Sequence, residues 1–311
     1  MNKKIALTGA TGFVGGHLLN ALKAHGYTIN ALTRRPQTQC DNVNWISGDL
    51  KDKTALKALI KDTDVIINVA GLVKAKSIDD FKEANTHAIS SLLSEIHNQE
   101  NPPHFIQISS ITAREPHLSD YAASKHQGEK FIMDDENVSK WTIIRPPGIY
   151  GPNDDETLKI FRMLKLRLAL YPGNRHNRVS WIYVHDLVSA ILKLMENEHF
   201  YGKTIEIDDG SDNGYSHQDF FDISSKIMNI KPIGISVPKF ILKTAGHTND
   251  IFGRILGYAP MVSAKKINEL CHADWVCHNE DTNNIKGWQA EHDLNHGLLA
   301  TLDWYKNNGY L

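Results

Sequence analysis

The chain has 311 residues, of which 41% are apolar and 23% are charged, and this is the composition of an ordinary globular protein with one large domain or two smaller ones. Its 34 Lys and Arg nearly balance its 36 Asp and Glu, so neither a nucleic-acid partner nor a charged disordered tail is indicated. The longest apolar run, residues 65–73, is interrupted by Asn68 and is far shorter than the roughly 18 residues of a membrane span. Three cysteines, and no signal-peptide apolar region after Met1, predict a cytoplasmic protein.

The first predicted element is a strand that leads into a glycine turn. The apolar residues 5–7 are followed by the turn 8–16 and then by an amphipathic helix over 17–26. Gly9 allows a tight turn, Gly12 lets a pyrophosphate approach the backbone, and Gly15 lets the helix pack closely. The N–H groups and the positive dipole end of the helix then face the phosphates. The layout predicts a dinucleotide cradle built from Gly9, Thr11, Gly12, Phe13, Val14 and Gly15.

Strand and helix patterns alternate through the first half of the chain. The strands are predicted over 27–33, 43–47, 64–70, 104–109 and 141–145, and the helices over 54–60, 78–97 and 121–133. Repeated units of this kind fold as a Rossmann-type doubly wound parallel sheet. Ligands of such sheets bind at the carboxyl ends of the strands, so the residues that follow each strand are the candidates for a site.

The alternation ends after Pro146. Residues 146–152 are predicted to form a loop, and they are followed by helices over 156–165 and 184–196 and a strand over 203–208 that rejoins the sheet. From residue 210 onward the pattern is mixed helix and loop, closed by a helix over 295–307 and a left-handed stop at Gly309. We therefore expect an α/β fold. Its Rossmann domain covers 1–150, completed by 184–196 and 203–208, and its smaller, mostly helical substrate lobe covers 151–183 and 209–311.

Two cations follow the second predicted strand. Arg34 and Arg35 stand where a dinucleotide fold that prefers NAD places an acid for the ribose 2′-hydroxyl. Guanidinium groups suit the 2′-phosphate of NADP, so NADP(H) is predicted as the cofactor rather than NAD(H). A solvated charged turn is the alternative. Asp49 and Leu50 follow the third strand, and we expect them near the adenine.

A tyrosine and a lysine share one face of a predicted helix. Tyr121 and Lys125 are four residues apart, and a nearby cation lowers the pKa of a phenol toward the range of a useful acid or base. Ser109 and Ser110 end the preceding strand, which brings a hydroxyl close enough to hold a carbonyl oxygen. The combination favours catalysis over an ordinary surface pair.

The sequence does not decide the roles of three other features, and a fourth is considered as a metal site. Asn85, inside the predicted helix 78–97, either bonds the loop after the fourth strand, reaches the lysine through water, or faces solvent. Arg178, with Lys165 and Arg175, either clamps a substrate phosphate or forms a solvated face. Trp181 either lines a pocket or fills the core. The pairs 271–272 and 277–278, each Cys-His, match no standard zinc spacing, so no metal site is predicted.

Together these motifs resemble those of an extended or atypical short-chain dehydrogenase/reductase of the NAD-dependent epimerase/dehydratase superfamily. The resemblance is carried by the glycine turn 8–15, by residues 68–71, 145–152, 184–187 and 301–311, and by the set Ser110, Tyr121 and Lys125. It implies that Tyr121 donates or accepts a proton at the substrate oxygen, that Ser110 orients that oxygen, and that Lys125 holds the nicotinamide ribose. Hydride then passes between nicotinamide C4 and the substrate carbon.

The resemblance also implies further binding residues. On the cofactor side these are Ala70 and Gly71 after the fourth strand, and Pro146, Gly148 and Ile149 beside the nicotinamide. Apart from the resemblance, Val73, Thr112, Arg178 and Trp181 are the candidates for contact with the substrate.

Two departures from the family pattern narrow the function. Ser110 is followed by Ile111-Thr112-Ala113 in place of the acidic pair of sugar-nucleotide dehydratases, and residues 111–120 are shorter than the usual insertion of the epimerases. The short segment is similar to reductase-like branches, including relatives of an NADPH-binding accessory subunit of respiratory complex I. We predict an NADP(H)-dependent oxidoreductase that acts on a carbonyl or secondary alcohol of a small or lipid-like molecule. The resemblance is compatible with a homodimer. The alternatives are a sugar-nucleotide epimerase with tightly bound NAD and a non-catalytic NADPH-binding assembly subunit.

Overall fold

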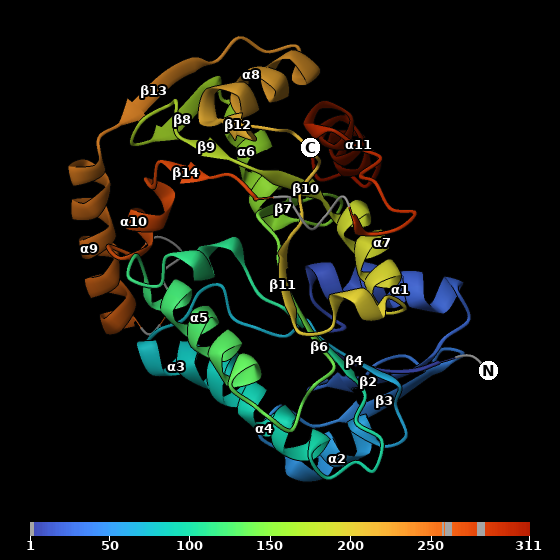
Figure 1. The fold of residues 1–311 in the computed structure, drawn as a ribbon. Helices are drawn as coiled ribbons and strands as arrows, with labels where there is room; N and C mark the ends of the chain where they lie inside the picture. The colour runs from blue at the N-terminus through green and yellow to red at the C-terminus, as the bar shows by residue number, and fades with distance from the viewer. Residues whose placement is uncertain (1–2, 257, 259–262, 279–283) are drawn as a thin grey trace. The chain divides into compact units, whose positions relative to one another are not determined.

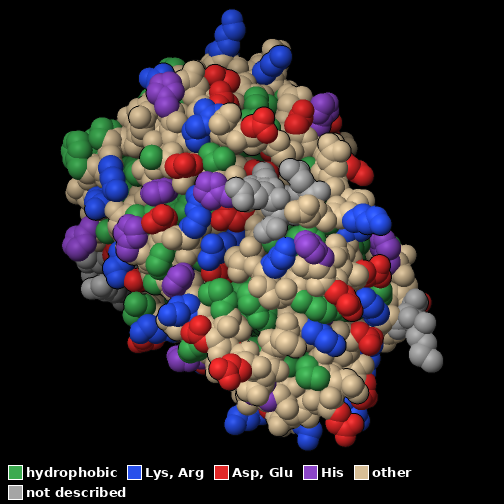
Figure 2. Space-filling view, in the orientation of Figure 1, with side chains coloured by type: hydrophobic (Ala, Val, Ile, Leu, Met, Phe, Trp, Pro, Cys, Tyr) green, Lys and Arg blue, Asp and Glu red, His purple; other side chains and the backbone are tan. Residues whose placement is uncertain are grey.

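The computed structural model describes residues 3–256, 258, 263–278 and 284–311 (Figure 1). The chain divides into two compact units. Unit 1 comprises residues 1–116, 120–145 and 188–205, and unit 2 comprises residues 117–119, 146–187 and 206–311. Side chains of both charges are mixed over most of the face seen in Figure 2, as the net charge of −2 leads one to expect.

Unit 1 is built on a central sheet of seven strands in the order β11-β6-β5-β4-β1-β2-β3. The strands are β1 (Lys4–Thr8), β2 (Thr28–Thr33), β3 (Val43–Ser47), β4 (Val65–Asn68), β5 (His104–Ile108), β6 (Trp141–Arg145) and β11 (Lys203–Glu206). The pairs from β3 across to β6 are parallel. All residues of β4 and β5 are buried, as expected for strands covered on both faces. The predicted doubly wound parallel sheet is therefore confirmed.

Helices cover the sheet on two sides. They are α1 (Phe13–Ala24), α2 (Lys53–Ile60), α3 (Ile78–Lys82), α4 (Ala88–Ile96), α5 (Asp120–Met133) and α7 (Val184–Leu194). The unit β1-α1-β2 advances toward β3, whereas β3-α2-β4 crosses back, so right-handed crossovers put α1 and α2 on opposite faces. Leu56 of α2, Leu92 of α4 and Ile132 of α5 are fully buried in one core cluster, which shows that these three helices share a face.

The predicted uniform helix over 78–97 is interrupted by a wider turn. A π-helical segment, Glu83–His87, joins α3 to α4. Here α5 comes close, because a Cβ at Gly128 would lie only 2.4 Å from the carbonyl oxygen of Asn85. Single π turns of this kind often occur at functional sites, and this one carries Asn85.

Unit 2 combines helices with short strands. Its helices are α6 (Asp155–Lys165), α8 (His217–Met228), α9 (Lys239–Leu256), α10 (Lys266–Leu270) and α11 (Leu294–Asn307). Its strands are β7 (Gly148–Tyr150), β8 (Leu168–Pro172), β9 (Arg178–Val179), β10 (Trp181–Tyr183), β12 (Tyr215–Ser216), β13 (Ile233–Val237) and β14 (Asp274–Trp275). They form three small sheets, and the core contains the buried Tyr150, Phe161 and Leu298. The last helix and its left-handed stop at Gly309, with φ +74°, agree with the prediction.

Two predictions about unit 2 are wrong in detail. Residues 146–152 do not form only a loop, because β7 pairs in parallel with β10. The chain after residue 210 contains β12, β13 and β14 in addition to helices and loops. These strands are two to five residues long and pair with distant partners, so they leave little periodicity in the sequence. In the described part of the chain, no helix has the length and apolarity that a bilayer crossing requires.

Candidate active site

The glycine turn between β1 and α1 has the geometry of a phosphate cradle. Gly9 adopts φ +70°, and a Cβ at Gly15 would lie 2.0 Å from the Gly9 carbonyl oxygen, so neither position tolerates a side chain without a backbone shift. Gly12 is the N-cap of α1; it supplies no capping side chain, and the first turn carries no acid. The amide groups at the start of this helix are therefore unopposed by a local carboxylate, which fits an anionic ligand.

A line of buried polar side chains links three strands at their carboxyl ends. The Thr8 hydroxyl donates to Asn68 Oδ1 and accepts from the backbone N–H of Ala70 at 3.1 Å. Asn68 Nδ2 donates to Gln107 Oε1 at 2.7 Å, and the amide of Gln107 donates to the Ile108 carbonyl at 2.7 Å. These bonds fix the ends of β1, β4 and β5 relative to one another, where the predicted residues Ala70 and Gly71 begin.

Ser110 follows β5 and caps a short 3₁₀ turn, Ile111–Arg114. Its hydroxyl oxygen accepts from the hydroxyl of Thr112 at 3.0 Å and from the backbone N–H of Thr112 at 3.3 Å. Ser110 therefore keeps its own proton to donate elsewhere. The hydroxyl of the preceding residue, Ser109, is buried and has no hydrogen-bond partner among the described residues. An orphaned hydroxyl at a ligand-binding edge fits a group that binds there.

Tyr121 and Lys125 lie one turn apart near the start of α5, and both are buried. Lys125 Nζ donates to the carbonyl oxygen of Ile108 at 3.0 Å, two residues before Ser110. A Cβ at Gly71 would lie 3.3 Å from the same nitrogen. The ammonium therefore bridges the ends of β4 and β5, on the helix that carries the tyrosine.

Burial sets the protonation of Lys125. Removal of the ammonium from water lowers its pKa from the ordinary 10.5 to about 8, against a smaller opposing effect of Glu129. The carboxylate of Glu129 is itself fully buried and takes two hydrogen bonds from Arg145, from Nε at 2.9 Å and from the terminal nitrogen at 2.6 Å. Since this bidentate pair already neutralises Glu129, Lys125 gains little charge compensation from it.

Asn85 connects the loop after β4 to α5. Its side-chain oxygen accepts from the Leu72 N–H at 2.9 Å, and its nitrogen donates to the Leu72 carbonyl and to the Ser124 hydroxyl, each at 3.0 Å. Asn85 is 2% exposed. The interpretation that it bonds the loop after the fourth strand is confirmed, and the solvent-facing alternative is wrong.

Other predicted cofactor residues lie where the sheet order leads one to expect. Arg34 and Arg35 follow β2 and are exposed. The backbone of Arg35 is held by two hydrogen bonds to the Thr33 hydroxyl, which leaves its guanidinium out of the turn itself. Asp49 follows β3 and accepts from the Lys51 N–H at 2.8 Å, whereas Leu50 packs against the core.

The remaining predicted residues fall in both units. Val73 belongs to unit 1 and is 57% exposed. In unit 2, Pro146 precedes β7, which contains Gly148 and Ile149. Arg178 donates to the carbonyls of Asn213 and Gly214, and Trp181 packs on the rings of Phe220 and Tyr150. These contacts favour the core role stated above for Trp181, and they give Arg178 a structural role that differs from both of its stated alternatives.

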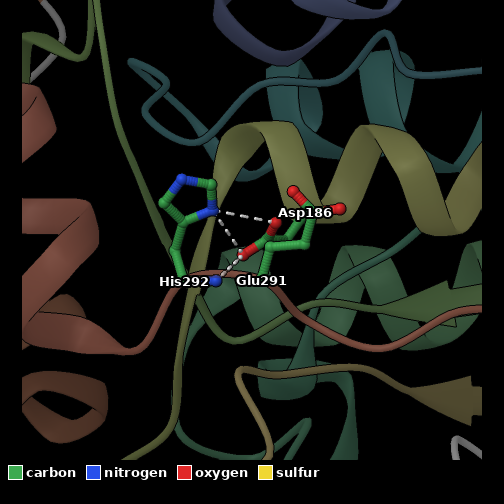
Figure 3. A group of neighbouring side chains, drawn as sticks. All are labelled: Asp186, Glu291 and His292. Atoms are coloured by element: carbon green, nitrogen blue, oxygen red, sulfur yellow. Dashed lines mark hydrogen bonds and ion pairs between the residues drawn. The ribbon is translucent and has the colours of Figure 1, made fainter.

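A group of potential metal ligands lies at the start of α7. Atoms of Asp186, Glu291 and His292 lie within 4.8 Å of one another (Figure 3). The His292 N–H donates to Asp186 Oδ2 at 3.0 Å, its Nδ1 lies 3.1 Å from Oδ1, and Trp288 Nε1 donates to the Asp186 carbonyl at 3.2 Å. These hydrogen bonds connect Trp288 and His292 to the start of α7, and they account for the closeness of Asp186 and His292.

Several residues of the site were not anticipated from sequence. They are Thr8, Gln107, Ser124, Glu129 and Thr86, whose hydroxyl donates to the Ser124 carbonyl at 3.0 Å. Their common signal is a polar residue in an otherwise apolar strand or on the inner face of a helix. Thr8, Gln107 and Ser124 each lie within two residues of a residue named in the sequence analysis, and Glu129 lies one helical turn from Lys125. Thr86 is next to Asn85.

Comparison with known proteins gives one family. The model described as "NAD dependent epimerase/dehydratase family" matches residues 5–207. A ceramide reductase of Caulobacter vibrioides is 32% identical over 311 residues, covering 99% of this chain and 96% of that protein. A UDP-glucose 4-epimerase of Vibrio cholerae is 23% identical and covers 97% and 95% of the two chains.

Solved structures share the fold. A UDP-glucuronic acid 4-epimerase from Bacillus cereus, in complex with UDP-glucuronic acid and NAD, superimposes with a TM-score of 0.76 at 19% identity, over 98% of this chain and 99% of that one. A human epimerase family protein with NADPH gives a TM-score of 0.74 at 16% identity, over 96% and 99%. The neighbours thus include complexes with either nicotinamide cofactor.

Proposed function

This chain belongs to the NAD-dependent epimerase/dehydratase family, and on that premise we propose that it is an NADPH-dependent reductase of a lipid-like carbonyl compound. It is an NAD(P)-dependent enzyme of the short-chain dehydrogenase/reductase type. When bound, NADPH supplies the hydride that the carbonyl carbon receives. The Tyr121 hydroxyl gives its proton to the carbonyl oxygen, so the product is a secondary alcohol. The Ser110 hydroxyl donates a hydrogen bond that orients the same oxygen.

The observation that carries this proposal is the environment of Lys125. Its ammonium is buried beside Gly71, bonded to the Ile108 carbonyl and one helical turn from Tyr121. Burial of a cation opposes folding, so a position like this is typical of a functional site rather than of ordinary packing. A cation here stabilises the Tyr121 phenolate left after proton transfer and has hydrogen atoms to offer to ribose hydroxyls.

The preference for NADPH rests on Arg34 and Arg35. Both are exposed at the carboxyl end of β2, and residues 33–40 contain no acid. An Arg34→Ala variant should bind NADPH about 10- to 100-fold more weakly, because a charge-assisted contact to the 2′-phosphate is lost, while NADH binding should hardly change. Titration of protein fluorescence with each cofactor measures both affinities. An equal loss for NADPH and NADH would remove the argument for the 2′-phosphate.

The lipid-like substrate class follows from the ceramide reductase relative, which is similar along nearly the whole chain. The test is to supply NADPH and a ketone-bearing ceramide-type lipid and to follow nicotinamide absorbance together with alcohol formation. One alcohol per NADPH oxidised is expected. A Tyr121→Phe variant should bind NADPH normally but turn over about a hundredfold more slowly or worse, since the proton donor is missing.

A matched control is Tyr27→Phe, which removes a partly exposed hydroxyl bonded to Glu196 in the same unit. It should keep wild-type turnover. Normal turnover in Tyr121→Phe would contradict the assigned proton donor. Absence of turnover in the wild type with every ketone of this class would contradict the substrate class and leave the cofactor assignment standing.

The runner-up function is a sugar-nucleotide epimerase, which the Vibrio cholerae relative favours. An epimerase regenerates its cofactor at each turnover and retains NAD, whereas a reductase must exchange NADPH for its oxidised form. Mass spectrometry of whatever nucleotide leaves the denatured protein separates the two. Stoichiometric NAD, with no release on gel filtration of the native protein, would favour the epimerase.

A further inference from the structure

Two strands of unit 2 present an apolar face to solvent. β8 and β13 pair in parallel with Leu168 opposite Ile233 and Leu170 opposite Ile235, so these four side chains share one face. Leu170, Ile233 and Ile235 are 40%, 66% and 44% exposed. A sheet with one solvated face normally carries polar residues there, so this apolar face is unusual.

The other face of β8 is already occupied by the core of unit 2, whereas Gly234 and Ser236 on that face of β13 are exposed. Ala169 and Tyr171 are buried, and a Cβ at Gly234 would lie 2.9 Å from the Tyr171 ring. The exposed Leu170, Ile233 and Ile235 therefore do not belong to the inner face of this sheet. They are surplus to the packing of the unit.

The helix that follows β13 also exposes apolar side chains. In α9, Ile241, Phe252 and Leu256 lie at helical spacing on one side and are 47%, 52% and 69% exposed. The opposite side makes the contacts with the rest of unit 2. Gly246 is buried against Ala264, and the Asp250 carboxylate accepts from the Ala264 N–H at 3.0 Å.

We use the term docking surface for the exposed apolar side chains of β8, β13 and α9 together with Leu166 and Phe240, which are 74% and 71% exposed. Figure 1 shows β13 leading into α9 at the left of the view, and Figure 2 shows hydrophobic side chains gathered over the start of α9 with cationic ones beside them. Patches of this kind on a monomer mark an interaction site.

The segments that supply the docking surface carry charge of one sign. The segments 157–185 and 223–249, which supply β8, β13 and most of α9, contain no Asp or Glu. Exposed cations flank the apolar side chains, namely Lys165, Arg167, Lys231, Lys239 and Lys243. The only acid of α9, Asp250, is on the inward side. A net charge of −2 for the whole chain makes this local excess of positive charge more pronounced.

We propose that the docking surface binds the interface of a lipid bilayer that contains anionic lipids. Apolar side chains ringed by lysine and arginine are the pattern of interfacial membrane binding, in which the apolar groups enter the acyl boundary and the cations meet lipid phosphates. A second copy of this chain fits less well. A two-fold contact would bring the same cations against one another with no acid between them.

Membrane binding at this surface does not depend on the proposed reductase activity, although it would bring the protein to the phase where a lipid-like substrate resides. The test uses the full chain without cofactor or substrate. Vesicles of phosphatidylcholine alone, and of phosphatidylcholine with an equal part of phosphatidylglycerol, are sedimented with the protein. We expect binding to the anionic vesicles that is at least about tenfold stronger and that falls as salt is added.

Two double variants separate the two components of the surface. Phe240→Ser with Ile241→Ser should weaken binding to anionic vesicles about tenfold or more through lost apolar insertion. Lys239→Glu with Lys243→Glu should weaken it by a similar or larger factor and abolish the preference for anionic lipid. The matched controls are Leu299→Ser, an apolar residue 42% exposed on α11, and Lys53→Glu with Lys57→Glu on α2, which should bind like the wild type.

The proposal is overturned if the wild type binds neither vesicle, if it binds both equally, or if the two surface variants bind as tightly as their controls. It is also overturned if analytical ultracentrifugation shows a dimer that the Phe240→Ser, Ile241→Ser variant dissociates, because the surface would then be a subunit interface. Any of these outcomes leaves the NADPH and Tyr121 tests unaffected.

Discussion

Polar side chains are buried at the carboxyl ends of β1, β4 and β5 in unit 1, whereas apolar side chains lie in water on β8, β13 and α9 in unit 2. Both arrangements oppose stability, since burial of a polar group removes its hydration and exposure of an apolar group keeps it in unfavourable contact with water. In unit 1 the cost is offset inside the chain. Thr8, Asn68 and Gln107 satisfy one another, and Asn85 makes three hydrogen bonds.

In unit 2 we propose that the same offset comes from outside the chain, because the side chains of the docking surface are exposed. Lys125 falls between these two cases. It is buried like the residues around it, yet among the described residues its ammonium donates one hydrogen bond, to the Ile108 carbonyl, and its pKa is lowered to about 8. A buried polar group is therefore compatible with a structural role when its partners are internal, and it indicates a ligand when they are not.

The largest effect should come from breaking the internal compensation at Asn85. An Asn85→Leu substitution keeps the approximate volume but leaves the Leu72 N–H and carbonyl and the Ser124 hydroxyl without their partner. We expect a loss of about 3 kcal/mol or more in the free energy of unfolding, measured by urea denaturation. Asn98→Leu, in an exposed position after α4, is the control and should change it by less than about 0.5 kcal/mol. Equal changes in the free energy of unfolding for the two variants would show that the hydrogen bonds of Asn85 do not stabilise the fold.

A substitution in α5 is expected to have the opposite effect, a gain in stability. Lys125→Met removes a cation whose burial is unfavourable, so at pH 7 the variant should be more stable than the wild type by about 2 kcal/mol, although it should lose the proposed activity. The advantage should shrink between about pH 8 and pH 10.5. In that range the folded wild type has already released the Lys125 proton while the unfolded chain still holds it, so the stability of the wild type rises with pH relative to the variant.

Thermal denaturation of both proteins across this pH range, without cofactor, measures the difference. A difference that stays constant with pH would mean that Lys125 keeps an ordinary pKa in the folded protein. A variant less stable than the wild type at pH 7 would mean that the ammonium is well compensated, and the argument for a function at this site would weaken.

Much of the fold and part of the site could be predicted from sequence because their signals are local. The glycine turn 8–16, the apolar strands and the spacing of Tyr121 and Lys125 each lie within one element and its neighbour. The link from Thr8 through Asn68 to Gln107 could not be predicted in this way. It depends on three strands that are far apart in the chain and adjacent only in the sheet.

The docking surface escaped prediction for a related reason. Ile233 and Ile235 alternate with Gly234 and Ser236 as the residues of any half-buried strand do. Only the structure shows that Ile233 and Ile235 lie in water, as Gly234 and Ser236 also do, although Gly234 comes close to the Tyr171 ring. Periodicity indicates that two faces differ, but which one is buried depends on the tertiary neighbours.

The smallest effect on stability is expected on β13, where the alternating pattern does not indicate which side chains are buried. Ile233→Thr on β13 should change the free energy of unfolding by less than about 0.5 kcal/mol, because the side chain is 66% exposed and its strand register is retained. Ile182→Thr on β10 of the same unit, where the side chain is fully buried, should cost about 2 kcal/mol or more. The pair is compared by urea denaturation in the absence of lipid. A cost at Ile233 equal to that at Ile182 would mean that this isoleucine is packed within the protein, and the apolar face of β8 and β13 would then need no external partner to explain it.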